Sequence, residues 1–541
     1  MPTEQRHSPS GATDELRAAW CDVLELDELA DDDNFFELGG HSMLATRLIS
    51  RAERILAVAV PARLIFEYPV FGDFAKQAVA LLDEGGTRAE PPPRLGLSSG
   101  PLSSQQEQQM VVEHLLGPSA MNNSLAVVRV SRELPITTVD QALAAVLARH
   151  PALRTAIVSE PGGDQQRLLP DSAVPAAPIE EVDLTAVSAQ RLPGEIRRRV
   201  AKAHRLPFDI AGGTLLRCQI LRCGDRPDVL ALHFHHSACD GAGLAVLLDD
   251  LAAMCADPDH VLAADEAELS YLDYAHWQRA HLEQLLDDSR SYWREVLRSL
   301  SAEPRDDEPS SALARSYAHC GEVIGADTVR VLRAWAAKDG VTDFAVLAAA
   351  GGVAASAGTG RRTVGLGTLL DNRSLPGSER TVGTFSVSSL VMLAVDGGAT
   401  PRKLARQLQQ RLAEARRWAA LPLELQLAEP AEEMGVNPAE VLDLVVSLDR
   451  IYLSDATRDP IFSMMEDDGP LTGLPAFGPR LSIQATIRPS DELDLVLEHL
   501  DGEPEGERAA ELLARTVAAL RAFADHPDEP LAELALGWPS G

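Results

Sequence analysis

Two adjacent histidines, His235 and His236, are followed after three intervening residues by Asp240 and Gly241 in the stretch HFHHSACDG. An imidazole titrates near neutral pH, so it can accept a proton from an attacking nucleophile. A carboxylate close by can orient the backbone or pair with an arginine instead of touching a substrate. The stretch therefore predicts either a proton-handling site or a hydrogen-bonded histidine pair at the end of a strand.

The flanking sequence indicates the elements that position these residues. Residues 228–236 alternate as a strand does, which puts Phe234 on one face with its apolar neighbours and His235 on the other. If the strand persists to its end, His235 and His236 point to opposite faces and cannot share one role. GAGLAVLLDDLAAM follows as a predicted helix, so Gly241 should present a backbone N–H group at the helix start.

A second stretch with chemical potential is FFELGGHSMLATRLI, in which Ser42 stands where a helix is predicted to begin. Gly39 and Gly40 allow a tight backbone path before it. A serine hydroxyl at that point lies beside free backbone N–H groups and the positive end of the helix dipole, which suits a phosphodiester on its oxygen. The alternative is that Ser42 is a plain helix N-cap.

The chain divides into two unequal parts around a Gly-, Pro- and Ser-rich linker, DEGGTRAEPPPRLGLSSG. Residues 1–83 carry helical periodicity only and predict a small helix bundle. Residues 84–100 are the linker. Residues 101–541 alternate predicted helices with predicted strands, which indicates an α/β body of two lobes.

The composition excludes several functions. A formal charge of −32 disfavours binding to nucleic acid and to anionic membranes, because both need clustered Lys and Arg. The longest weakly apolar run, residues 344–358, is too short to span a bilayer. The six cysteines show no CxxC pair and no metal-ligand spacing, so we expect reduced thiols, no metal and a cytoplasmic location.

The residues around Ser42 resemble a known family. DNFFELGGHS is similar to the attachment motif of peptidyl carrier proteins of non-ribosomal peptide synthetases, and VPARLIFEYPVFGDFA resembles the third and fourth helical segments of that family. The resemblance covers nearly the whole of residues 1–83. It implies a four-helix carrier whose Ser42 holds a covalent 4′-phosphopantetheine arm, attached by a phosphopantetheinyl transferase.

The second part resembles condensation domains, relatives of chloramphenicol acetyltransferase, from about Pro101 to Leu536. HHSACDG matches their HHxxxDG signature, and further motifs occur in the family's order: PLSSQQEQQMVVEHL, RHPALRT, YLDYAHWQ, VGTFSVSSLVM and RDPIF. The chain departs from the family at Gln108, at Met110 and at the run FSVS, Phe385 to Ser388. The resemblance implies two acetyltransferase-like lobes in a V, an N-lobe at about 101–270 and a C-lobe at about 271–541.

The resemblance also implies roles for single residues. His236 is the candidate that acts as general base or positions the attacking amine, and His235 supports the fold. Asp240 is assigned a structural role as the salt-bridge partner of an arginine, for which Arg373 in GTLLDNR stands at the matching position. The backbone N–H group of Gly241 could help to stabilise an oxyanion.

The implied reaction is amide bond formation between a donor aminoacyl or peptidyl thioester on the carrier and an aminoacyl acceptor on a downstream carrier. The implied partners are other synthetase domains, upstream and downstream, including an adenylation domain and the acceptor carrier. No epimerization domain separates carrier and condensation domain here, which favours a donor ending in an L-residue or glycine. The alternatives are a catalytically silent recruitment module and an epimerization-type relative.

Overall fold

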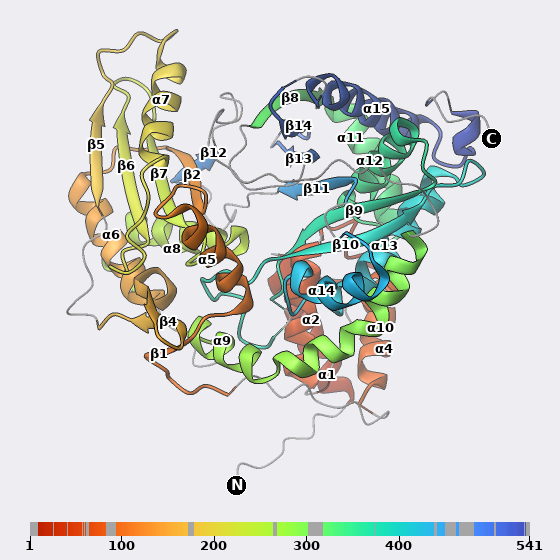
Figure 1. Ribbon diagram of the computed structural model, residues 1–541, viewed down its shortest axis with the longest axis horizontal. Helices are drawn as coiled ribbons and strands as arrows, with labels where there is room; N and C mark the ends of the chain where they lie inside the picture. Colours follow the sequence, from red (N-terminus) through yellow and green to blue (C-terminus); the bar gives the residue numbers. More distant parts are fainter. Residues whose placement is uncertain are drawn as a thin grey trace.

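The computed structural model describes the chain in segments. They are residues 9–24, 26–40, 42–56, 58, 60, 64–82, 93–170, 178–262, 268–300, 317–373, 375–437, 441–449, 461–464, 481–488, 490–502, 505–534 and 536. These segments form a helical unit followed by two mixed α/β lobes, which stand apart as the arms of a V and meet at its base (Figure 1).

The helical unit packs around one tryptophan. It consists of α1 (Pro9–Leu24), α2 (Ser42–Leu56), α3 (Leu64–Glu67) and α4 (Phe71–Ala80). Trp20 is fully buried, and its ring lies 5.3 Å, 5.4 Å and 5.5 Å from the rings of Phe35, Phe71 and Phe74. Aromatic contacts of this kind bury large apolar areas, which lets a unit of this size form its own core. The prediction of a small all-α unit is confirmed.

The N-lobe is built on a five-stranded sheet. Its strand order is β12-β2-β7-β6-β5, with β12 (Phe462–Met464), β2 (Asn123–Val130), β7 (Asp228–His235), β6 (Leu216–Arg222) and β5 (Ile179–Asp183). The lobe's helices are α5 (Ser104–Leu116), α6 (Ile136–Arg149), α7 (Leu192–His204) and α8 (Gly241–Ala256), with the short 3-10 turn η1 (Pro151–Arg154). A smaller sheet joins β1 (Ser99–Pro101), β4 (Gly163–Leu168) and β3 (Thr155–Glu160).

The C-lobe has a six-stranded sheet in the order β10-β9-β11-β13-β14-β8. Its strands are β8 (Tyr317–Ile324), β9 (Thr363–Leu370), β10 (Val387–Ala394), β11 (Leu444–Asp449), β13 (Leu481–Ile487) and β14 (Leu493–Leu500). Its helices are α9 (Tyr271–Ala280), α10 (Leu282–Leu300), α11 (Ala326–Lys338), α12 (Asp343–Thr359), α13 (Pro401–Arg416), α14 (Leu423–Met434) and α15 (Glu505–Asp525), with a last turn η4 (Leu531–Glu533).

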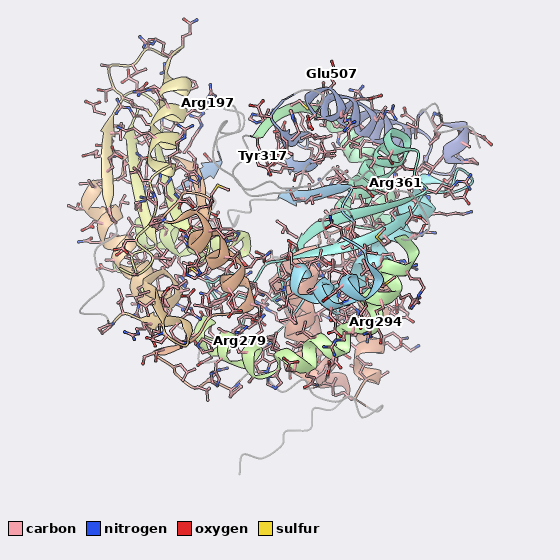
Figure 2. All side chains as sticks on the ribbon, viewed as in Figure 1. Arg197, Arg279, Arg294, Tyr317, Arg361 and Glu507 are labelled. Atoms are coloured by element: carbon pink, nitrogen blue, oxygen red, sulfur yellow. The ribbon has the colours of Figure 1, made fainter. Side chains whose placement is uncertain are left out.

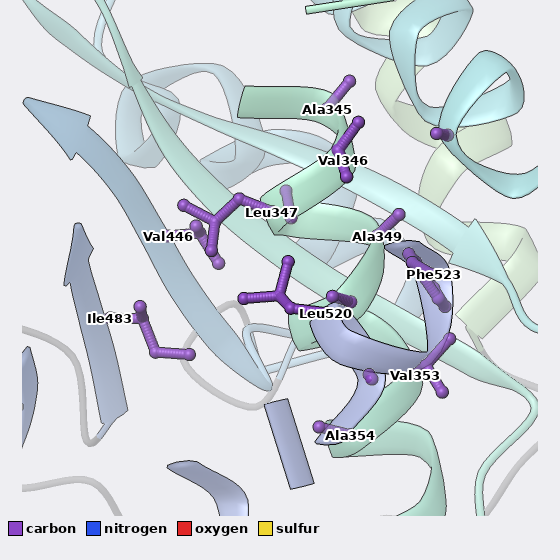
Figure 3. Packing of buried hydrophobic residues seen from close by; sticks show 14 of the residues in the cluster. Ala345, Val346, Leu347, Ala349, Val353, Ala354, Val446, Ile483, Leu520 and Phe523 are labelled. Carbon is purple, nitrogen blue, oxygen red and sulfur yellow. The ribbon is translucent and has the colours of Figure 1, made fainter. Parts of the chain in front are cut away.

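The weakly apolar run at 344–358 is the central helix of the C-lobe. It forms most of α12, which packs between the sheet residues Val446 and Ile483 and the α15 residues Leu520 and Phe523 (Figure 3). Small residues allow this close approach, since a Cβ atom at Gly352 would lie 2.6 Å from Leu393. No single helix within the described residues has both the length and the apolar character to cross a bilayer. Among the described helices, α11 and α12 pass that test when they are counted together, but the chain bends by 112° at the break between them.

Contacts at the base of the V join the lobes. Arg279 on α9 pairs with Glu107 on α5 at 2.7 Å and 2.8 Å (Figure 2). The hydroxyl of Tyr271 donates to the Thr384 carbonyl and lies 2.7 Å from the Ser103 hydroxyl. These polar contacts fix the base of the V from which both arms rise.

Two details differ from the boundaries predicted from the sequence. Residues 462–464 form β12, which pairs with β2 in the N-lobe sheet although the sequence placed them in the C-lobe. A strand from one lobe can complete the exposed edge of the other sheet in this way. Ser99 and Gly100, predicted as the end of the linker, already form β1 against β4.

The helical unit contacts the C-lobe. Ala337, near the end of α11, packs against the apolar core of the unit. Gly340 follows in a left-handed conformation with φ of 65°, and a Cβ atom there would lie 2.9 Å from the Phe66 carbonyl oxygen. This close approach needs a glycine both for its backbone and for the space.

Candidate functional site

The two adjacent histidines have different environments. Strand β7 ends at His235, whose side chain is buried, whereas His236 lies in the following turn and is partly exposed. The expectation that the strand continues through residue 236 is therefore wrong by one residue. The backbone N–H of His236 donates to the Asn122 carbonyl at 2.7 Å, and a turn starts where Ala238 N–H donates to the His235 carbonyl at 3.0 Å.

Neighbouring backbone groups fix opposite tautomers in the two rings. His236 Nδ1 lies 3.1 Å from the Cys239 carbonyl oxygen, which can only accept, so Nδ1 carries the proton and Nε2 is left as an acceptor. His235 Nδ1 accepts from the Ser237 N–H at 3.2 Å, so in the neutral ring the proton is on Nε2. Only His236 combines partial exposure with an unprotonated outer nitrogen.

Asp240 is fully enclosed by donors. Its Oδ1 accepts from Arg373 Nη2 at 2.7 Å and from the Gly243 N–H at 2.8 Å. Its Oδ2 accepts from Arg373 Nη1 at 2.9 Å and from the backbone of Phe385 and Ser386 at 2.9 Å and 3.0 Å. The contact between Asp240 and Arg373 that the sequence predicted is present.

The pKa values of Asp240 and Arg373 follow from this enclosure. Burial alone would raise the pKa of Asp240, but the Arg373 guanidinium and the backbone donors outweigh it and hold the pKa below its usual value. Burial would lower the pKa of Arg373, but the Asp240 carboxylate raises it above the ordinary value. The pair therefore stays ionised and ties the N-lobe turn to the C-lobe segment between β9 and β10.

Gly241 is the first residue of α8, as predicted from the sequence. The Asp240 side chain caps the helix through Gly243, which leaves the N–H of Gly241 without an acceptor among the described residues. Gly241 is exposed, and a Cβ atom there would meet no described atom within 4 Å. A free N–H at a helix start in open space can face a developing negative charge.

Two residues that sequence reasoning did not select complete the surroundings of the histidines. Glu113 on α5 places Oε1 3.0 Å from Asn122 Nδ2 and 3.6 Å from His235 Nε2. Glu113 belongs to the stretch PLSSQQEQQMVVEHL, in which the sequence indicated a motif. Nothing local in the sequence links that stretch to the histidines.

Ser42 is the first residue of α2, as predicted, but its side chain and His41 lie outside the described residues. The backbone path that leads to Ser42 requires glycine at two positions. Gly39 is left-handed with φ of 93°, and a Cβ atom at Gly40 would lie 2.3 Å from the Phe35 ring. The backbone thus brings residue 42 to a helix start where free N–H groups and the dipole favour a phosphate, which fits a phosphopantetheine attachment.

Of the other predicted motifs, RDPIF is described only at Ile461 and Phe462, both buried. Within the described ranges, no three His, Cys, Asp or Glu side chains are arranged to hold a metal ion.

Two family models match this chain. The family model "Condensation domain" matches residues 98–537, and "Phosphopantetheine attachment site" matches residues 14–77. A probable nonribosomal peptide synthetase of Salinispora arenicola, CymA, is 34% identical over 71% of this chain and 5% of its own length. Surfactin synthase subunit 2 of Bacillus subtilis is 27% identical over 98% of this chain and 14% of its own length. The chain thus spans a small fraction of the relatives it matches.

Solved structures show the same fold. The first condensation domain of the calcium-dependent antibiotic synthetase, in complex with a substrate analogue, matches with a TM-score of 0.65 and 20% identity. That match covers 81% of this chain and 99% of the solved one. The X-domain in complex with OxyB from teicoplanin biosynthesis matches with a TM-score of 0.61 and 20% identity, over 83% and 97% of the two chains.

Proposed function

We propose that this chain, which belongs to the condensation-domain family and carries a phosphopantetheine attachment domain ahead of it, joins a donor acyl group to an aminoacyl acceptor through His236. Condensation domains of nonribosomal peptide synthetases are peptide-bond-forming acyltransferases, and the chain is of that enzyme class. The single observation that carries the role of His236 is its partly exposed ring with an unprotonated Nε2, held by the Cys239 carbonyl.

The reaction is aminolysis of a thioester. The nitrogen of the acceptor amine forms a bond to the donor carbonyl carbon, the carbon–sulfur bond breaks, and the thiol leaves. His236 Nε2 receives the proton that the amine loses, and the same proton passes to the departing sulfur, so no other reactant is needed. A positioned amine also gains rate because little entropy of encounter remains to be lost.

The neighbouring residues support His236. The free N–H of Gly241 faces the oxygen on which negative charge develops when the amine attacks. Asp240 and Arg373 hold the turn between residues 236 and 240 in place and do not touch the substrate, because every oxygen of Asp240 is already bonded within the protein. His235, buried beside Ser237, supports the same turn.

Ser42 is the attachment point for the cofactor. When attached by a phosphopantetheinyl transferase, 4′-phosphopantetheine supplies the thiol that carries the donor. Because the carrier precedes the condensation domain, we assign to it the donor of this condensation, ending in an L-residue or glycine. The acceptor arrives on a downstream carrier charged by an adenylation domain. The six free cysteines suit a reducing cytoplasm.

A single-turnover assay tests the proposal. The donor is loaded on Ser42, with the added mass verified and Ser42→Ala as the unloaded control, and a separate acceptor carrier is supplied. We expect His236→Ala to lower the rate of amide formation by about a hundredfold or more, with an unchanged melting temperature. The matched control is His260→Ala, an exposed histidine of the same lobe, which should keep the wild-type rate.

Each other outcome identifies a specific error. Full activity in His236→Ala removes the catalytic assignment. Loaded wild-type protein that forms no amide with any acceptor offered favours the alternative of a silent recruitment module, and inversion of the donor without amide formation identifies an epimerization-type relative. No mass gain at Ser42 with an active transferase contradicts the carrier assignment.

A further inference from the structure

Glu113 lies on α5, near the end of β7 at His235, and its side chain is buried. Its Oε1 accepts a hydrogen bond from Asn122 Nδ2 at 3.0 Å and lies 3.6 Å from His235 Nε2. Asn122 Nδ2 also donates to the Gln109 carbonyl at 3.1 Å, one turn earlier on the same helix. The amide of Asn122 is therefore fixed by two acceptors of α5.

The outer nitrogen of His235 depends on the same carboxylate. Because Nδ1 accepts from the Ser237 N–H, the proton of the neutral ring is on Nε2. Nε2 is buried and has no hydrogen-bond acceptor within normal range among the described residues. The carboxylate of Glu113, at 3.6 Å, is the negatively charged group that faces it. An isosteric amide at residue 113 would remove the negative charge that faces this N–H group.

The link to His236 runs through the backbone. The carbonyl oxygen of Asn122 accepts from the N–H of His236 at 2.7 Å, the shortest backbone contact of the turn. The ring of His236 is oriented by Nδ1 and the Cys239 carbonyl at 3.1 Å. A shift of Asn122 would move the backbone of His236 while Nδ1 of its ring stays hydrogen-bonded to the Cys239 carbonyl, so the ring would rotate and Nε2 would change direction.

The carboxylate of Glu113 is ionised in this environment. Burial would raise its pKa, but the contacts with His235 and Asn122 outweigh burial and lower the pKa below its usual value. A backbone hydrogen bond from Ser119 adds to the lowering.

We propose that Glu113, acting through Asn122, is a positioning residue that sets the orientation of His236 for amide formation, while its carboxylate supports the Nε2–H tautomer that the Ser237 N–H gives to His235. This inference rests on the proposed function of His236. Glu113 acts through the two histidines, so it should govern the rate of the bound complex and leave the affinity for the acceptor carrier unchanged.

The test compares Glu113→Gln with wild type in the full chain loaded at Ser42. We expect kcat to fall about tenfold to a hundredfold, because a misplacement of about 1 Å can cost about a hundredfold, while KM for the acceptor carrier changes by less than about twofold. In protein with ¹⁵N-labelled histidine rings, the wild-type signals should report protonated Nε2 in His235 and protonated Nδ1 in His236. The His235 signature should change in Glu113→Gln.

A matched control and a second variant make the result decisive. Glu133→Gln, the same change at an exposed glutamate of the same lobe, should leave kcat and both histidine signatures unchanged. Asn122→Ala should lower kcat, and its effect should not multiply with that of Glu113→Gln, since the two residues act through one network. If Glu113→Gln is poorly folded, Asn122→Ala alone decides the case, because a wild-type kcat in that variant overturns the inference.

Wild-type kcat and unchanged histidine signals in Glu113→Gln overturn the inference, as do effects of the two variants that simply multiply. If His236→Ala is inactive in the same assay, such a result leaves the proposed function intact. If His236→Ala is fully active, the proposed function itself fails.

Discussion

Two buried polar clusters, one between the lobes and one inside the N-lobe, differ in their charge. In the first, Asp240 and Arg373 are both ionised, and each carboxylate oxygen has two or more donors. In the second, His204 and His233 lie with ring centres 5.9 Å apart, and Nδ1 of each has no hydrogen-bond partner among the described residues. Burial is similar, since all four residues are 4% exposed or less.

What differs is the charge of the neighbours. Asp240 faces a guanidinium that compensates it, whereas burial and the neighbouring Arg217 both disfavour a proton on the histidines. Burial lowers the pKa of His204 to about 4 and that of His233 to about 3, with Arg217 adding to each shift. Of these two clusters, only the one that contains a counterion is charged, and only that one joins the two lobes.

The largest expected effect comes from removing one member of the charged pair. Arg373→Ala leaves Asp240 ionised in the interior without its guanidinium, and we expect a loss of about 3–5 kcal/mol in the free energy of unfolding. Chemical denaturation at pH 7 measures it. Arg294→Ala, which breaks an exposed pair with Glu433 on the surface of the C-lobe (Figure 2), should destabilise the protein far less, because water already screens that pair.

A double variant sharpens this prediction. Asp240→Asn combined with Arg373→Met removes both charges, so it should destabilise the protein less than Arg373→Ala alone. A double variant that is less stable than the single one would contradict the view that the uncompensated carboxylate is the main cost. It would show that the neutral contacts of the pair carry the stability.

The sequence predicted those parts of the site that are local. The helix start at Ser42 and the helix start at Gly241 follow from glycines and periodicity, and the pairing of Asp240 with Arg373 followed from family resemblance. Contacts that depend on tertiary structure were beyond its reach. One such contact joins Asn122 to His236, since the carbonyl of residue 122 accepts from the N–H of His236 at 2.7 Å, and no periodicity encodes that contact.

The same reason explains the missed residues. Glu113 reaches His235 only because α5 lies near the end of β7, and His204 reaches His233 only because α7 covers the face of the sheet to which His233 points. A lone histidine inside an apolar strand, such as His233, is predicted from the sequence as a core residue. Its depressed pKa arises from neighbours that the fold supplies.

The uncharged pair of His204 and His233 should make the free energy of unfolding depend on pH, with a loss of stability in acid. Unfolded histidine has a pKa of 6.5, and that of folded His204 is about 4, so between these values the unfolded chain binds more protons. The free energy of unfolding should therefore fall as pH decreases from about 6.5 to about 4, by about 3 kcal/mol from His204 alone, and be insensitive to this residue above pH 7.5.

Denaturant titrations at four pH values, roughly 4.5, 5.5, 6.5 and 7.5, measure how the free energy of unfolding changes with pH. His204→Gln removes one of the two titrating groups and should make the slope shallower, with His233 still contributing, whereas His260→Ala, which removes an exposed histidine, should leave the slope as it is. A wild-type profile without any decline in that window means that the buried ring takes up its proton freely.

The smallest effect concerns the one hydrogen bond that His233 makes with its outer nitrogen. Nε2 lies 3.1 Å from Gln219 Oε1, and Gln219 Nε2 in turn donates to Glu180 at 2.6 Å. Gln219→Leu keeps the apolar volume of the side chain but leaves the buried ring without a partner, so we expect a loss of about 1–2 kcal/mol at pH 7. Glu180 is exposed and can turn to water, so its lost bond should cost little.

The variant Gln219→Asn restores a hydrogen-bond acceptor at residue 219. It should recover part of the stability if the unpaired imidazole of His233 is the cause of the loss. No recovery would point instead to packing of the leucine against the neighbouring strands.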